Sequence, residues 1–363
     1  MKKTLKWLLV LTIIMSVFAG YSLIGCSQAA EESATEAVEE EVEEVAEQET
    51  VQEEATAEEP LEFACVAKGM HPFYDPGGEG MQAAAEEIGG INVRYIAPSE
   101  WSGEAQLKML ENLIAEGVDG IAIAVYEAGS LTTGIKEAVS RGIPVVTWDD
   151  DAKDSDRSIF IGTDNIESGK MQGELFVDMV GEEANFVIWV QDLAARTVNE
   201  RLQGIRMVTD EYPGLVEVRD VLLSTMLMDE AIPIAETLLD SFPELEAILD
   251  TGPNGTAATV KMLEERGVDP GEIKMICWDA DSYPEILNGI RNGYIDAAMV
   301  QNPYAMGYLS GYALKWLIEG KEPDIDNVNS GITVITKDNV DTIAETRIEQ
   351  TAELFEEFKK HWK

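Results

Sequence analysis

The chain has 363 residues and carries 69 acidic against 26 basic side chains, which gives a formal net charge of −43. This acid excess argues against a nucleic-acid partner, because phosphate recognition needs a basic face, and it disfavours direct contact with an anionic membrane surface. His71 and His361 are the only histidines, so a histidine-based zinc site or a Ser-His-Asp triad is almost excluded. We therefore expect no nucleic acid, no metal and no cofactor.

The N-terminus has the pattern of a secretory signal. Three lysines within the first six residues precede an apolar run that extends to Leu23, and a basic segment followed by an apolar one directs export. The run leads into Leu-Ile-Gly-Cys, which ends at Cys26 and resembles the lipobox of bacterial lipoproteins. We predict a signal peptide over residues 1–25 and lipidation of Cys26, which would tether the protein to the cell membrane outside the cytoplasm. A transmembrane anchor that happens to end in Cys is the alternative.

The next segment is acidic and has few large apolar groups. Between Ala30 and Glu59 it contains 14 Glu and no aromatic, glycine or basic residue. Like charges at this density repel one another, and the segment cannot bury enough apolar surface to offset the entropy lost on ordering. We predict that residues 26–60 form a disordered linker that holds the folded part away from the membrane.

Beyond the linker, apolar strand-like runs alternate with amphipathic helix-like segments. The clearest example has Leu107, Leu110 and Leu113 on one face of a helix, with charged residues opposite. Gly117 is placed to end this helix in a left-handed conformation. The next run, residues 121–125, is apolar at every position, as in a parallel strand covered by helices on both sides.

The same unit recurs along the chain. Strand-like runs occupy residues 63–67, 91–96, 121–125, 144–148, 185–190, 216–222, 247–250, 274–278 and 297–300. Alternation of this kind predicts an α/β fold with right-handed crossovers. So many strands in a body of this length exceed what one core holds, which predicts two doubly wound parallel-sheet lobes.

Ligands of such folds bind outside the carboxyl ends of the strands, so the residues after each strand are the candidates for function. They are rich in aromatic, carboxylate and amide side chains. The sequence has no GxGxxG fingerprint, no phosphate loop ending in GK[ST] and no GxSxG motif, which removes the usual nucleotide-binding and hydrolase signatures.

Three consecutive acids, Asp149, Asp150 and Asp151, come after the fourth run. An EF-hand that started at Asp149 would need an acidic or amide ligand at position 5 and Gly at position 6, where the chain has Lys153 and Asp154, so this calcium motif does not match. A carboxylate pair for glycoside hydrolysis remains an alternative. The sequence nevertheless favours a protein that binds a molecule without changing it, and we predict that it is not an enzyme.

The strand ends also carry a family resemblance. Periplasmic sugar-binding proteins of ABC transporters, of the ribose-binding type, have motifs that resemble, in the same order, VAKGMHPFYDPGGEG, AEGVDGIAIA, GIPVVTWDDDA, IFIGTDN, RLQGIRMVTDEYPG and NGIRNGYIDAAMVQNPYAMG of this chain. The resemblance extends from Leu61 to about Asp341. It implies the type 1 periplasmic-binding-protein fold, in which two lobes joined by a three-strand hinge close on a small molecule.

The resemblance also implies the boundaries of the lobes. The hinge would lie at residues 162–165, 301–303 and 330–334. The N-terminal lobe would contain residues 61–164 plus 302–330, and the C-terminal lobe residues 165–301 plus 331–340.

Residues 341–363 extend beyond the usual end of the family and read as a polar C-terminal helical extension. Its large apolar side chains are placed to form a stripe against one of the lobes. They are Ile348, Leu354, Phe355 and Phe358.

The family implies ligand-binding roles for the matching residues. Aromatic rings suit the apolar C–H faces of a sugar, and a carboxylate accepts two hydroxyl protons in charge-assisted hydrogen bonds. The matches are Phe73 and Tyr74 for the rings that sandwich the sugar, Asp149 for the acid after the fourth strand, Arg201 for the Arg of R-x-x-G, and Asp279 and Gln301 for the polar groups of the C-terminal lobe.

The chain departs from the ribose-binding pattern at several candidate positions. Ribose binders have Arg where this chain has Asp150, which is predicted either as a second clamp on the ligand or as a contact between the lobes. Asn254 comes after Gly-Pro where the family often has Asn-Asp, and Asp151 is predicted to be a solvated turn residue. Lys68 and Trp148 complete the candidates, since Lys68 and the TWDDD segment look closer to the branch that binds autoinducer-2 and rhamnose.

These residues predict the class of ligand and the role of the protein. Asp149, Asp150 and Asp279 outnumber Lys68 and Arg201, so an anionic ligand would meet like charge, and we expect an uncharged sugar or polyol. The expected function is that of an extracytoplasmic, monomeric solute-binding lipoprotein of a sugar-type ABC importer, with permease and ATPase subunits as partners. A ligand-sensing subunit for a receptor kinase, of the autoinducer-2 or sugar type, is the alternative.

Overall fold

The computed structural model describes residues 59–193, 195–223 and 227–363. The predicted signal peptide, Cys26 and nearly all of the predicted linker lie outside these residues. Within the described part of the chain, no helix is both long enough and apolar enough to cross a membrane.

The first of two sheets is parallel throughout and has the strand order β12-β5-β4-β3-β1-β2. Its strands are β1 (Leu61–Val66), β2 (Ile91–Ile96), β3 (Gly120–Ile123), β4 (Val145–Trp148), β5 (Ile159–Gly162) and β12 (Asn327–Asn329). Its helices are α1 (Asp75–Ile88), α2 (Gly103–Glu116), α3 (Ala128–Ser140) and α9 (Pro303–Ile318). We call this sheet with its four helices the N-lobe.

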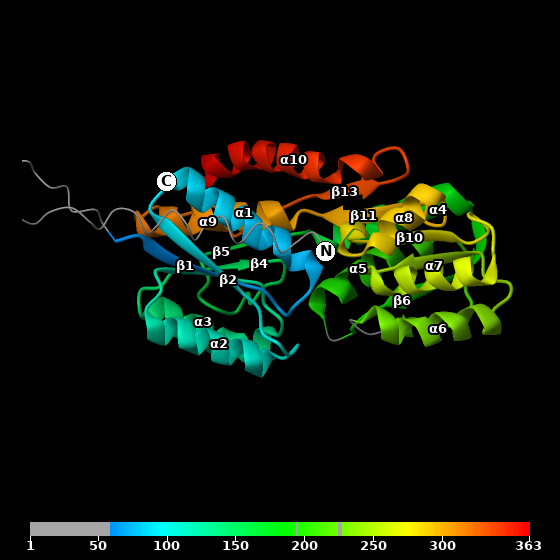
Figure 1. The fold of residues 1–363 in the computed structure, drawn as a ribbon, viewed down its shortest axis with the longest axis horizontal. Helices are drawn as coiled ribbons and strands as arrows, with labels where there is room; N and C mark the ends of the chain where they lie inside the picture. The colour runs from blue at the N-terminus through cyan, green and yellow to red at the C-terminus, as the bar shows by residue number, and fades with distance from the viewer. Residues whose placement is uncertain (1–58, 194, 224–226) are drawn as a thin grey trace, which may run out of the picture. The chain divides into compact units, whose positions relative to one another are not determined.

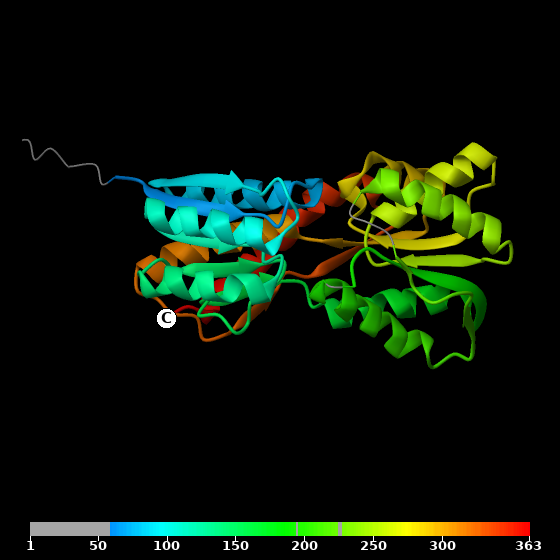
Figure 2. The same cartoon turned by 90° about the horizontal axis from the view of Figure 1, so that it is seen from below.

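Helices cover both faces of the N-lobe sheet, so the lobe has a separate apolar core on each face. In Figure 1, α1 and α9 lie on one side of the strands and α2 and α3 on the other. Figure 2 shows α2 and α3 side by side on their face. This arrangement explains why β3 and β4 are buried along their whole length and carry no alternating polar positions.

Local sequence fixes the ends of α2 as predicted. The Ser102 side chain accepts a hydrogen bond from the Ala105 backbone N–H at 3.1 Å and so caps the first turn. Gly117 ends the helix at φ 74°, a left-handed conformation that glycine adopts without steric cost. Leu110 and Leu113 are fully buried on the face that the apolar spacing indicated.

The second sheet has the order β13-β11-β10-β9-β6-β7, is parallel except for the pair β11 and β13, and carries the two-residue strand β8 beside β6. Its strands are β6 (Glu183–Val190), β7 (Gly214–Glu217), β8 (Leu222–Leu223), β9 (Ala247–Asp250), β10 (Lys274–Trp278), β11 (Ala297–Gln301) and β13 (Ile332–Ile335). Its helices are α4 (Asn165–Val180), α5 (Arg196–Thr209), α6 (Met228–Ser241), α7 (Asn254–Arg266) and α8 (Pro284–Asn292). This sheet and its helices form the C-lobe, which again has one apolar core on each face. The predicted α/β fold with two parallel-sheet lobes is confirmed.

One predicted strand is wrong in extent. The run at 216–222 is not a single strand but two short ones, β7 and β8, separated by a turn. Arg219 and Asp220 lie in this turn, and Val216 is 48% exposed at the edge of the sheet. The apolar residues therefore do not form a continuous buried run, because charged residues interrupt them at an edge.

The chain passes between the two sheets three times in the regions predicted as the hinge. It leaves the N-lobe after β5, returns after β11 and leaves again between β12 and β13. It then crosses once more, because α10 (Ile343–Phe358), the helix after β13, packs against α9 of the N-lobe. Figure 1 shows α10 alongside α9.

Part of the predicted apolar stripe of the C-terminal extension packs against the N-lobe. Phe355 stacks on Trp316 and contacts Tyr312, with ring centroids 6.1 and 4.4 Å apart, and Phe358 is 1% exposed. Ile348 does not belong to the stripe, since it is 58% exposed.

Candidate ligand-binding site

A cavity lies between the carboxyl ends of strands from both lobes. Of the ten candidate ligand-binding residues, the structure brings seven to its wall: Lys68, Phe73, Tyr74, Asp149, Arg201, Asp279 and Gln301. Most of the seven lie at or just after the ends of parallel strands, whose carboxyl ends meet at one edge of a sheet, whereas Arg201 comes from α5.

Two aspartates, one from each lobe, face the cavity with the same unusual backbone. Asp149 comes after β4 with φ 62° and Asp279 after β10 with φ 53°, and among the described residues they are the non-glycine positions with positive φ. Each is preceded by a buried Trp, and their backbone N–H groups donate to the carbonyls of Ile161 and Met299 at 3.1 and 2.9 Å. Asp tolerates this left-handed conformation better than most residues, and such strain persists where the surroundings impose it, commonly at functional sites.

Asp149 is held by groups of its own lobe. Lys68 Nζ lies 2.9 Å from Asp149 Oδ2, and the Tyr74 hydroxyl donates to the same oxygen at 3.4 Å. Burial alone would lower the pKa of Lys68, but the charges of Asp149 and Asp150 raise it, so the ammonium stays charged. Both contacts from the described chain fall on Oδ2, which leaves Oδ1 as the acceptor that a ligand hydroxyl can use.

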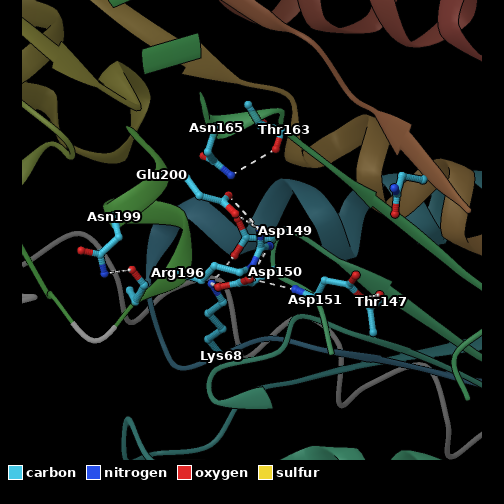
Figure 3. A network of polar contacts seen from close by, with 12 residues as sticks. Lys68, Thr147, Asp149, Asp150, Asp151, Thr163, Asn165, Arg196, Asn199 and Glu200 are labelled. Atoms are coloured by element: carbon cyan, nitrogen blue, oxygen red, sulfur yellow. Dashed lines mark hydrogen bonds and ion pairs between the residues drawn. The ribbon is translucent and has the colours of Figure 1, made fainter. Parts of the chain in front are cut away.

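Asp150 joins the two lobes. Its Oδ1 accepts from Arg196 Nε at 2.8 Å and lies 2.6 Å from Arg196 Nη2, at the start of α5 in the C-lobe, while its Oδ2 lies 3.3 Å from Lys68 Nζ. Burial on its own would raise the pKa of Asp150, but the charges of Lys68 and Arg196 lower it. Figure 3 shows the carboxylate between these two cations. Of the two predicted roles, the structure shows the contact between lobes, and Asp150 does not line the cavity.

Asp151 was predicted to be a solvated turn residue, and this is wrong. Its carboxylate accepts from Arg157 Nε at 2.9 Å and Nη2 at 2.8 Å, and from the Thr147 hydroxyl at 2.7 Å. The side chains of Asp151 and Arg157 are 9% and 3% exposed. A two-pronged guanidinium contact of this kind is the strong form of an ion pair, so Asp151 anchors the strand end inside the N-lobe.

Arg201 reaches the cavity from α5. Its Nε donates to Asn165 Oδ1 at 2.9 Å and its Nη1 to the Thr251 carbonyl at 2.8 Å, and the guanidinium carbon lies 3.7 Å from the centre of the Trp278 ring. Burial lowers the pKa of Arg201, while Asp279 acts in the opposite direction. A stacked, hydrogen-bonded guanidinium is rigid, so the remaining N–H groups point in fixed directions.

Gln301 connects Asp279 to the hinge. Its Nε2 donates to both Asp279 oxygens at 3.3 and 3.0 Å, and its Oε1 accepts from the Thr163 hydroxyl at 2.9 Å. Burial raises the pKa of Asp279 to about 6, although the charge of Arg201 lowers it. The carboxylate of the C-lobe is thus positioned by residues at two of the passages between the sheets.

Aromatic residues form one wall of the cavity. Phe73 and Tyr74 are in direct T-shaped contact, with centroids 5.0 Å apart and an interplanar angle of 86°, so no sugar ring fits between them. His71 of this wall contacts the C-lobe, because its Nε2 lies 3.2 Å from the Tyr283 hydroxyl. Its Nδ1 accepts from the Phe73 backbone N–H at 3.1 Å, which leaves the proton of a neutral ring on Nε2.

Two further candidates do not reach the cavity wall. Trp148 is fully buried below Tyr74, with ring centroids 5.7 Å apart, and it packs against Gly77 so closely that a side chain there would collide with the indole. Asn254 is fully buried at the start of α7. Trp148 is the last residue of β4, where successive side chains point to opposite faces of the sheet, so it packs inside the N-lobe while Asp149 faces the cavity.

Several residues of the wall were not among the ten candidate ligand-binding residues. Tyr126, Gln191 and Asp192 come directly after strand-like runs, so the position after a strand was a sufficient signal for them. Trp101 and Thr197 gave no such signal, since they lie in a loop before α2 and in the first turn of α5.

Comparisons with known proteins agree with this architecture. A family model described as a periplasmic binding protein domain matches residues 63–322. The ribose import binding protein RbsB of Bacillus subtilis is 23% identical over 252 residues, which are 69% of this chain and 79% of that protein. The D-allose-binding periplasmic protein of Escherichia coli is 25% identical over 260 residues, 68% of this chain and 81% of that protein.

Solved structures show the same fold. A solute-binding protein of an ABC transporter from Burkholderia graminis, in complex with D-arabinose, is 32% identical and superposes with a TM-score of 0.74 over 78% of this chain and 97% of its own. A sugar-binding protein of a sugar ABC transporter from Bacillus halodurans is 27% identical, with a TM-score of 0.70 over 77% and 99%. The chain belongs to the periplasmic binding protein family, as its motifs predicted, and has the type 1 fold of that family.

The raised pKa of Asp279 predicts a pH dependence of stability. The pKa of an Asp in an unfolded chain is about 3.9, whereas the pKa of Asp279 in the folded protein is about 6. The contribution of Asp279 to stability is therefore present below about pH 4 and lost as the pH rises through about 6. The quantity to follow is the free energy of unfolding of the ligand-free wild type minus that of the Asp279→Asn variant. We expect this difference to fall by on the order of 2–3 kcal/mol between about pH 4 and 7.

Urea unfolding at four pH values measures this difference. Asn tolerates the left-handed backbone of position 279, so the variant tests the charge and not the conformation. Asp250, whose pKa burial raises to about 7, titrates in the same range but is present in both proteins and cancels. A difference that stays flat or rises with pH would contradict the account of Asp279.

Proposed function

We propose that the chain is the extracytoplasmic solute-binding component of a sugar-type ABC importer and that its cavity takes one small uncharged sugar or polyol. The observation that carries this proposal is the pair Asp149 and Asp279. Each lobe presents one carboxylate from a strand end to the same cavity. A molecule with several hydroxyl groups can donate to both at once and so favour closure of the lobes.

The charges around the cavity support an uncharged ligand. Asp149, Asp192 and Asp279 line it together with Lys68 and Arg201, and Lys68 is already paired with Asp149. An anionic ligand would have to replace an existing ion pair or approach a carboxylate in a partly dry space, which is costly. A neutral polyol needs neither.

The relatives support the same class of ligand. They are named for ribose and D-allose, and one structural neighbour was solved with D-arabinose. The relatives are named as binding proteins, so we assign this chain a binding role and no reaction. Importer permease and ATPase subunits are its partners, and the chain acts as a monomer. Nothing in its described residues favours the sensor alternative.

The bodies that move are residues 61–164 plus 302–330 and residues 165–301 plus 331–340, which rotate about the passages between the sheets. Outside the folded part, Cys26 carries the lipid anchor and residues 26–60 serve as an acidic spacer. The spacer holds the lobes at a distance from the membrane. The negative charge of the protein would be repelled by an anionic membrane surface.

A thermal-shift panel tests the ligand assignment. The panel contains D-ribose, D-xylose, D-arabinose, D-allose and xylitol, and for comparison glucuronate and ribose 5-phosphate. A true ligand at about a hundred times its Kd stabilises the folded state by roughly 2.7 kcal/mol. We expect at least one neutral member to raise the Tm of the wild type and the two anions to leave it unchanged.

The same panel tests Asp149. Asp149→Asn should abolish the shift while the ligand-free variant stays folded, because Asn keeps the backbone and the shape but removes the charged acceptor. Asp156→Asn is the matched control, since Asp156 is exposed in the same segment, and it should shift as the wild type does. A shift with the anions alone, or normal binding by Asp149→Asn, would show that the pocket assignment is wrong.

Replacement of Cys26 tests the anchor. The Cys26→Ala variant has no thiol to carry a lipid, so the exported protein should move from the membrane fraction to the soluble fraction. Fractionation of cells that express either form measures this. If the variant stays in the membrane fraction and still partitions into detergent, the segment before it is a transmembrane anchor and the lipoprotein assignment fails.

A further inference from the structure

The C-terminal helix α10 lies outside the segment that matches the family, which ends at residue 322. Its C-terminal half is fastened to the N-lobe. Phe358 is buried, with its ring 5.6 Å from that of Trp316. Beyond the helix, Glu322 and Lys363 exchange two backbone hydrogen bonds of 3.0 and 3.1 Å.

The N-terminal half of the same element is fastened to the C-lobe. Ile343 belongs to the apolar core beneath the second sheet. Thr333 of β13 donates to Gln350 Oε1 at 2.9 Å, and Arg291 of α8 pairs with Asp341 at 2.8 Å. The extension is therefore attached to both lobes and forms a further link beside the three strand passages.

Arg347 lies where this link passes the hinge. Its guanidinium pairs with the Asp281 carboxylate and donates to the Gln301 carbonyl from Nε at 3.3 Å and Nη2 at 3.1 Å. In return, its own carbonyl accepts from Asn302 Nδ2 at 3.2 Å. The Arg347 side chain is 11% exposed, so these contacts are largely shielded from water.

Both partners of Arg347 are joined to the cavity. Gln301 turns its carbonyl to Arg347 and its side chain to Asp279, and Asp281 lies two residues after Asp279 in the same short helical turn. Arg347 itself is not part of the cavity wall. It therefore fixes the backbone on both sides of the Asp279–Gln301 pair from outside the site.

We propose that α10 is a strap across the hinge and that Arg347 is a positioning residue, which holds Asp279 and Gln301 in the geometry that accepts the ligand hydroxyls. The inference rests on the proposed function, because it concerns the same cavity. A Lys at this position could pair with Asp281 but could not also reach the Gln301 carbonyl with a planar fork. A partial loss of binding in Arg347→Lys would therefore separate the contribution of the guanidinium hydrogen bonds to Gln301 from that of the positive charge.

Calorimetric titration tests the proposal, with the neutral panel member that stabilises the wild type most as the probe. We expect Arg347→Ala to raise Kd about tenfold, within the usual range for coupling between separate sites. Arg347→Lys should lie between it and the wild type. Asp281→Asn removes the charge that pairs with Arg347 and should also raise Kd. This variant tests the proposal if Arg347→Ala fails to fold. Arg141→Ala is the matched control, since Arg141 is exposed and its side chain pairs, among the residues that the structure describes, only with Glu137 in the helix before it. This variant should bind as the wild type does.

A double-variant cycle separates positioning from general destabilisation. If Arg347 acts through Asp279, then Arg347→Ala should add little to the loss already caused by Asp279→Asn. Full additivity, or wild-type affinity in both Arg347→Ala and Asp281→Asn, would overturn the inference while sugar binding stands. A wild type that binds no panel member would instead overturn the proposed function, and this inference with it.

Discussion

The rest of the structure depends on the pairing of three adjacent carboxylates at the end of β4. A buried charge without a partner costs several kcal/mol, so the segment is stable only because each acid meets a different cation. Lys68 approaches Asp149, Arg196 approaches Asp150, and Arg157 holds Asp151. One of these cations belongs to the other lobe. The electrostatic balance at this strand end is therefore complete only when the lobes are in contact, which links the acidic segment to the closing of a binding protein.

The C-lobe repeats the N-lobe arrangement with different partners. A buried Trp precedes a left-handed Asp at the end of both β4 and β10. Asp149 is balanced by a lysine salt bridge, whereas Asp279 is held by the amide of Gln301 and keeps a raised pKa. Because one carboxylate is paired and the other is only hydrogen-bonded, the two ends of the cavity offer acceptors of different strength to a ligand.

Periodicity and strand ends allowed much of the fold and part of the cavity to be predicted from the sequence. The covered strands, the cap at Gly117 and the placement of Asp149 and Asp279 all depend on patterns within a few residues. Arg196 was beyond this reasoning, because it starts a helix in one lobe and its partner ends a strand in the other. Trp148 was misjudged for the opposite reason, since neighbours on a strand face opposite sides and only packing decides which side is the cavity.

Arg347 of α10 donates to the backbone carbonyl of Gln301 without lining the cavity, and this contact is the basis for the positioning role that we propose for the extension. In the proposed function, one neutral sugar or polyol bridges the two lobes. A crystal structure of the protein grown with the panel member that stabilises it most would show whether it does. We expect hydroxyl oxygens of a single molecule within hydrogen-bond distance of both Asp149 and Asp279, with Asp150 still paired to Arg196. A ligand that contacts only one of the two carboxylates, or that lies outside the cavity, would contradict it.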